Sequence, residues 1–89
     1  MQRYQSVFGQ IELTDERLRH VLDFHPEVNV YLDKFEDALG KPDHIKPSKY
    51  DASVMIFYRS LPRGKWLAIV VKVNARHFVL TAYVTSRIL

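Results

Sequence analysis

A single lysine interrupts an apolar stretch near the end of the sequence. In KWLAIVVKVN, residues 65–74, Lys72 stands between two valines. Successive side chains of a strand point to opposite faces, so Lys72 is expected on the face opposite those valines. The same alternation places Arg59, Thr81 and Tyr83 on that second face. Cations and hydroxyls of this kind contact phosphate, which makes the face a candidate site for a polyanion.

Aromatic residues accompany these cations. Trp66, Phe57 and His77 have the same strand parity as Lys72. Aromatic and cationic side chains on one sheet face are typical of a platform that stacks bases and binds phosphates. The alternative is equally open, because antiparallel sheets commonly leave one face to solvent and Lys72 would then be an ordinary solvated residue.

Two histidines lie on or beside a predicted first helix, DERLRHVLDFH. His20 falls roughly 160–200° from the apolar stripe of this helix, so it is free to line a cleft, although an ordinary surface histidine fits as well. His25 lies near the stripe and precedes a proline, which favours packing or helix termination. The two histidines are five residues apart, whereas a zinc helix needs four. No glycine-rich phosphate or dinucleotide motif occurs, so neither a metal ion nor a cofactor is predicted.

The elements that position these side chains follow from the apolar spacing. Residues 7–13 are expected to form a short strand or an extended lead. Thr14 is a predicted N-cap for the first helix, and Pro26 opens a second helix that ends at Gly40. Both helices have one apolar stripe to bury.

The second half of the chain is predicted to be mostly strand. Residues 42–52 should be irregular, with one short strand around His44 and Ile45. Three strands then follow, at 53–61, 65–73 and 77–88, joined by the turn sequences PRG and NAR.

Helices followed by an antiparallel meander predict an α+β fold. Two N-terminal helices should pack on one face of a four-stranded antiparallel sheet. The set expected under the helices is almost wholly apolar: Val54, Ile56, Tyr58, Leu67, Ile69, Val71, Val73, Phe78, Leu80, Ala82 and Val84.

Composition fits this picture. The 89 residues are enough for one domain, expected to span 1–89, and 47% of them are apolar against 26% charged. Without cysteine there is no disulfide and no thiolate metal site.

The longest apolar run, WLAIVV, is too short for a membrane span, and the N-terminus has no signal-peptide core, so we expect a cytoplasmic protein that is complete at its N-terminus. The net charge of +3 favours an anionic partner, although such a charge is common in other small domains.

The order of four motifs along residues 11–88 resembles a known pattern. ERLRHVL and HPEV lie in the helical half, PDHI follows it, and TAYVT lies in the last strand. In this order they resemble the phage- and toxin-associated nucleases of the barnase, EndoU, colicin and RelE superfamily. That resemblance implies N-terminal helices on a four-stranded antiparallel sheet.

The resemblance also implies a function, a metal-independent endoribonuclease that leaves 2′,3′-cyclic phosphate ends. The matching catalytic positions are His20 as base or acid, Arg59 and Lys72 as phosphate stabilisers, and Thr81 as a hydrogen-bond donor. The residues expected to bind RNA are Trp66, Tyr83 and His77.

The implied partners are RNA and a cognate antitoxin or immunity protein, as for a toxin or a phage-linked effector. Two alternatives remain open. One is a non-catalytic module that binds RNA or protein through the same face. The other is a structural domain whose polar face docks against a partner protein.

Overall fold

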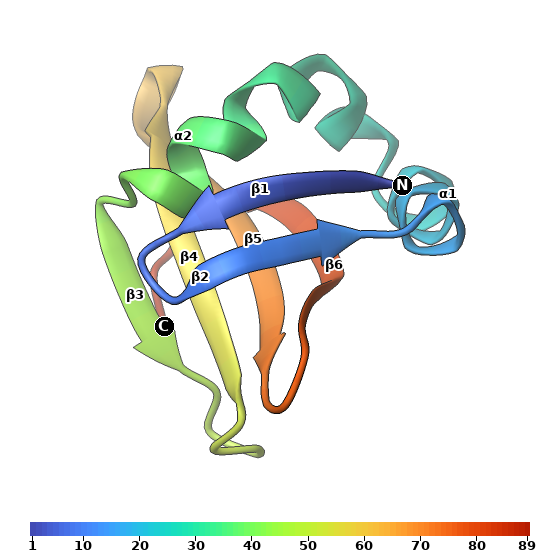
Figure 1. Ribbon diagram of the computed structural model, residues 1–89. Coiled ribbons are helices and arrows are strands. Elements are labelled where there is room, and N and C mark those ends of the chain that lie inside the picture. Colours follow the sequence, from blue (N-terminus) through green and yellow to red (C-terminus); the bar gives the residue numbers. More distant parts are fainter.

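The structure is a computed structural model that describes all of residues 1–89 (Figure 1). It confirms the α+β class. The elements in chain order are β1 (Gln2–Ser6), β2 (Gly9–Leu13), α1 (Asp15–Phe24), the 3-10 helix η1 (Pro26–Lys34), α2 (Phe35–Gly40), β3 (His44–Pro47), β4 (Val54–Leu61), the 3-10 turn η2 (Pro62–Gly64), β5 (Lys65–Val73) and β6 (His77–Thr85).

The sheet has six strands in the order β1-β2-β6-β5-β4-β3, so the prediction of a four-stranded antiparallel sheet is wrong. The strand expected within residues 7–13 is present as β2, and it pairs with β1, which was not predicted, to form a hairpin. Its tight turn is held by the Ser6 hydroxyl, which donates to Gly9 O and accepts from Phe8 N, and Gly9 has a φ of 100°. The hairpin joins the rest in parallel through one residue pair, Glu12 and Phe78, and crosses β4, β5 and β6 at a steep angle (Figure 1).

The first helix begins and ends as its sequence indicates. Thr14 caps α1 by accepting from Arg17 N at 3.2 Å, and the helix stops before Pro26. The second expected helix instead divides into η1 and the six-residue α2. Two β-branched valines, Val28 and Val30, lie in η1 and lower its preference for regular α-helix.

One large core lies between the helices, the β1–β2 hairpin and one face of β4–β6, which we call the inner face. The core is made of 14 buried apolar residues: Ile11, Leu13, Val21, Val28, Phe35, Ala38, Leu39, Phe57, Leu61, Leu67, Ile69, Val71, Val79 and Ala82. The opposite face of β4–β6 is the outer face. Its side chains, by register, are Val54, Ile56, Tyr58, Ser60, Trp66, Ala68, Val70, Lys72, Phe78, Thr81, Tyr83 and Thr85.

The sequence predicted which alternate residues of each strand face the core, and this prediction is correct for β5 and wrong for β4. Phe57 pairs with Ile69 and enters the main core, whereas Ile56 and Tyr58 lie on the outer face. Both parities of β4 are apolar because the strand is buried on both sides, so alternation alone could not assign its faces. Ile56, Tyr58 and Ala68 form a second, smaller buried cluster.

In β6 a bulge changes the parity partway along the strand. Val70 pairs with Thr81 but Val71 pairs with Val79, which leaves Leu80 as the extra residue. Ala82 is therefore inner as predicted, but Val79 takes the inner position expected for Phe78. Phe78 faces outward, opposite Lys72.

Candidate functional site

The outer face brings together four of the predicted site residues: Trp66, Lys72, Thr81 and Tyr83. Thr81 is paired with Val70 and Tyr83 with Ala68, so both share a face with Lys72, as the alternation predicted. Lys72 is two residues beyond Val70, so it is a diagonal neighbour of Thr81 on the same face. This arrangement puts one cation and two hydroxyls on one side of the sheet.

Lys72 is held at one end of the outer face by an acid that the sequence analysis missed. Its Nζ lies 2.8 Å from Asp51 Oδ2, and Asp51 Oδ1 also accepts from the backbone and the hydroxyl of Ser53. These donors hold the pKa of Asp51 well below its usual range, with the hydrogen bond from Lys72 as the largest cause. The Lys72 side chain is 27% exposed.

Tyr83, on β6, lies near the middle of the outer face, opposite Ala68 of β5. Burial raises the pKa of its hydroxyl, and the neighbouring Tyr58 raises it further. Tyr83 is therefore protonated at neutral pH and acts as a hydrogen-bond donor. The ring of His25, in the link from α1 to η1, lies 5.9 Å from the Tyr83 ring between centroids. Glu27 Oε2 is 3.7 Å from His25 Nδ1, close enough to interact electrostatically with the imidazole.

Trp66 marks the other end of the outer face. His44 on β3 packs edge-on against it, with ring centroids 5.3 Å apart. Lys46 is two residues along β3 and pairs with Ile56, so it belongs to the same face as His44. Because Ile56 pairs with Val70, Lys46 lies nearer to the Lys72 end of the outer face than to Trp66.

Arg59 does not share this surface, which corrects the predicted placement. It pairs with Leu67 and therefore lies on the inner side of β4. Its Nη1 donates to Lys41 O at 2.7 Å, and next to it Asp43 accepts from Ser60 N at 2.8 Å. Arg59 thus fastens the loop that follows α2 to β4, a structural role.

His20 is also separated from the other predicted catalytic residues. It is exposed on α1, and its ring packs against Phe24 of the same helix with centroids 4.7 Å apart. His25 is the C-cap of α1, which confirms its predicted role in helix termination, and its ring lies beside that of Tyr83. The helical spacing placed His20 off the apolar stripe correctly, but it could not show which side of α1 meets β6.

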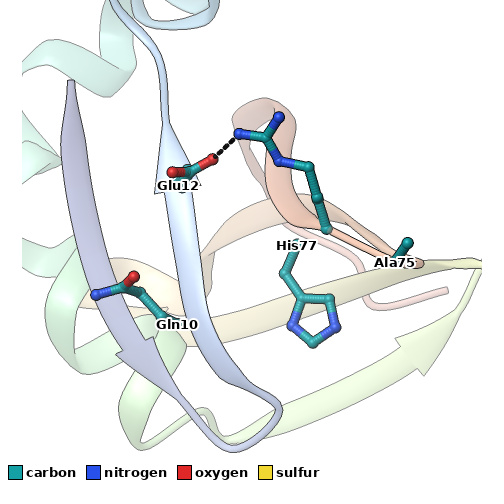
Figure 2. Close-up of a pocket in the computed structure, with 5 residues that line it drawn as sticks. Gln10, Glu12, Ala75 and His77 are labelled. Carbon is teal, nitrogen blue, oxygen red and sulfur yellow. Dashed lines mark hydrogen bonds and ion pairs between the residues drawn. The ribbon is translucent and has the colours of Figure 1, made fainter.

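His77 lies opposite Val73, on the inner-face parity, and not beside Lys72. It lines an open pocket of about 230 Å³ together with Gln10, Glu12, Ala75 and Arg76. Arg76 Nη2 lies 2.9 Å from Glu12 Oε1 across the pocket, while the His77 ring points away from this ion pair (Figure 2). Arg3 also approaches Glu12, at 3.5 Å, so its carboxylate is engaged by two cations.

Two further properties of the molecule bear on its chemistry. No three His, Asp or Glu side chains are grouped in a way suited to a metal ion. No helix is both long and apolar enough to cross a membrane.

Comparison of the chain with protein-family models, with curated proteins and with solved structures gives no match. The resemblance to the barnase, EndoU, colicin and RelE superfamily therefore stays a prediction. The functional argument rests on the outer face itself.

Proposed function

We propose that the protein is an endoribonuclease that cleaves RNA on its outer face without a metal ion. The observation that supports this most strongly is the convergence of Lys72, Thr81 and Tyr83 on one sheet face, with the His25 ring 5.9 Å from that of Tyr83. An imidazole, a hydroxyl and an ammonium can supply the base, the acid and the phosphate contact of RNA cleavage by 2′-hydroxyl attack.

Each group has a role in this reaction. His25, next to Glu27, accepts the proton of the 2′-hydroxyl as the 2′-oxygen forms a bond to phosphorus. Tyr83 is protonated at neutral pH and donates toward the 5′-oxygen as its bond to phosphorus breaks. Lys72 and Thr81 stabilise the negative charge that grows on the phosphate oxygens. The products are a 2′,3′-cyclic phosphate and a 5′-hydroxyl.

The aromatic end of the face supplies the base contacts. Trp66 is half-buried and supported by His44, so its ring is held in place before RNA binds. Stacking of an unpaired base on such a ring is sequence-tolerant. A role as a toxin paired with an antitoxin stays a prediction from the resemblance.

The test is incubation of the purified protein with mixed RNA in EDTA, with the yield of cyclic-phosphate ends measured over time. We expect His25→Gln and Lys72→Met each to lower the initial rate at least 100-fold, the scale of an acid–base or phosphate contact. His20→Gln is the matched control and should leave the rate unchanged. Asp51→Asn is the second control, because it removes the partner of Lys72 but keeps the ammonium.

The outcomes separate the candidate functions. Equal losses in His20→Gln and His25→Gln would contradict our assignment of the base. Equal losses in Asp51→Asn and Lys72→Met would mean that the ion pair, and not the ammonium, is what matters. RNA that binds through Lys72 but stays intact would identify the non-catalytic RNA-binding module.

A further inference from the structure

A short segment after β6 folds back over the outer face. Ser86–Leu89 follows the last strand without pairing in the sheet, and Ile88 packs on the cluster of Ile56, Tyr58 and Ala68. Leu89 N donates to the Tyr58 hydroxyl at 3.4 Å. The segment therefore runs from β6 across the sheet to β4, where Tyr58 lies, and Figure 1 shows it passing behind the strands.

Few contacts hold this segment. Ile88 provides its apolar contact, and the hydrogen bond from Leu89 is long. Ser86 and Arg87 are exposed, and Leu89 is 62% exposed. By contrast, β6 pairs with β5 along nearly its whole length. Segments with few buried contacts open far more readily than the strands that they cover.

The surface beneath the segment is aromatic and carries hydroxyls. Tyr58 is fully buried although it lies on the outer face, and Trp66 and Tyr83 pack around the same cluster. Moving Ser86–Leu89 away would uncover the Tyr58 ring and free its hydroxyl, between the aromatic end of the face and Lys72. Rings with adjacent hydrogen-bonding groups suit a base that is not paired with another base.

We infer that Ser86–Leu89 is a displaceable strap over a stacking subsite for an unpaired RNA base, formed by Tyr58, Trp66 and Tyr83. This inference rests on the proposed function and adds a substrate preference to it, for single-stranded over double-stranded RNA. An extended single strand inserts a base where the strap now lies, whereas a duplex keeps its bases stacked inside the helix.

The experiment loosens the strap in the full chain with Ile88→Ser. The matched controls are Ile88→Leu, which keeps the apolar contact, and Val30→Ser, which removes an exposed valine from η1. Binding of a fluorescently labelled oligouridine of eight nucleotides and of an RNA duplex is measured by anisotropy in EDTA. We expect Ile88→Ser to bind the single strand about tenfold more tightly, with both controls and the duplex unchanged.

A second measurement needs no RNA. The protein has one tryptophan, Trp66, so quenching of its fluorescence by iodide reports the opening of the strap directly. Quenching should increase in Ile88→Ser and stay the same in Ile88→Leu. Unchanged quenching, or loss of the fold in Ile88→Ser, would overturn the strap as a displaceable element.

The failure of this inference is distinguishable from that of the proposed function. If Lys72→Met abolishes binding but Ile88→Ser leaves single-strand affinity unchanged or lower, the strap inference is wrong and the outer face still binds RNA. If Lys72→Met leaves binding unchanged, the proposed function fails and the subsite fails with it.

Discussion

The inner and outer faces of β4–β6 are both largely apolar, but they are covered in different ways. The inner face is covered by three helical segments, α1, η1 and α2, and by the β1–β2 hairpin, and the core there has 14 buried residues. The outer face has a cluster of only three buried residues, and a four-residue segment lies over it. Polar groups interrupt the outer face: Lys72 lies at one end, Thr81 is its diagonal neighbour, and Tyr83 lies further along, opposite Ala68.

The two faces therefore have different roles: the inner face stabilises the fold, and the outer face is available to bind a ligand. The hydrophobic free energy scales with the apolar area removed from water, so the inner face supplies most of the folding stability. Moving Ser86–Leu89 off the outer face exposes much less apolar area, so it costs less folding free energy. The aromatic and charged groups of that face then lie within reach of a ligand. A domain of this size has room for one large core, which leaves its second sheet face available for function.

The largest effect on stability is expected when a carboxylate replaces one of two adjacent valines of β5. Val71 is fully buried on the inner face, whereas Val70 is half-buried on the outer face. Val71→Asp puts an unpaired carboxylate in the core, at a cost of several kcal/mol, against a total stability of about 4–13 kcal/mol for this length. We expect Val71→Asp to be unfolded by circular dichroism at 25 °C, and Val70→Asp to be folded with a lowered thermal midpoint. Complete unfolding of Val70→Asp would show that the two faces are equally important for folding.

The same comparison explains what could be predicted from the sequence. Where one parity was apolar and the other mixed, as in β5, alternation identified the faces correctly. In β4 both parities were apolar, and no local pattern distinguishes Phe57 in the main core from Tyr58 under the strap. In β6 the extra residue Leu80 shifted the alternation, and a bulge of this kind has no reliable signature in a single sequence.

The candidate site was predictable to the same degree. Lys72, Thr81 and Tyr83 follow the alternation of β5 and the end of β6, so their common face was found. Arg59 was misplaced because β4 was assigned the wrong parity. Asp51 was missed, and the place of His25 beside Tyr83 was not predicted, because these contacts join segments distant in sequence and a periodic pattern carries no information about them.

An intermediate effect on thermal stability is expected at Glu12, where the β1–β2 hairpin joins β6. Glu12 is next to Arg3 and Arg76 at the single residue pair between β2 and β6. Its side chain is 19% exposed, so we expect Glu12→Ala to cost about 1 kcal/mol, which lowers the thermal midpoint by about 4–8 °C. Glu12→Gln, which keeps the shape without the charge, should show most of this loss at low salt and less of it at 1 M salt. A loss in Glu12→Gln that does not depend on salt would argue against an electrostatic role for Glu12.

The smallest effect concerns the ion pair on the outer face and its dependence on pH. The pKa of Asp51 is lowered in the folded protein, so the pair stabilises the fold above the ordinary carboxyl pKa of about 4. That contribution is lost as the pH falls below this value toward the lowered pKa of the folded state. In Lys72→Met we expect the thermal midpoint to lie slightly below that of wild type at pH 7 and to fall less between pH 5 and pH 2, so that the two midpoints approach each other at low pH. Asp51→Asn is the matched control and should give the same flatter profile, because either substitution removes the pair. A Lys72→Met profile parallel to that of wild type would mean that Ser53, which also donates to Asp51, accounts for the lowered pKa and that Lys72 is free to serve a ligand alone.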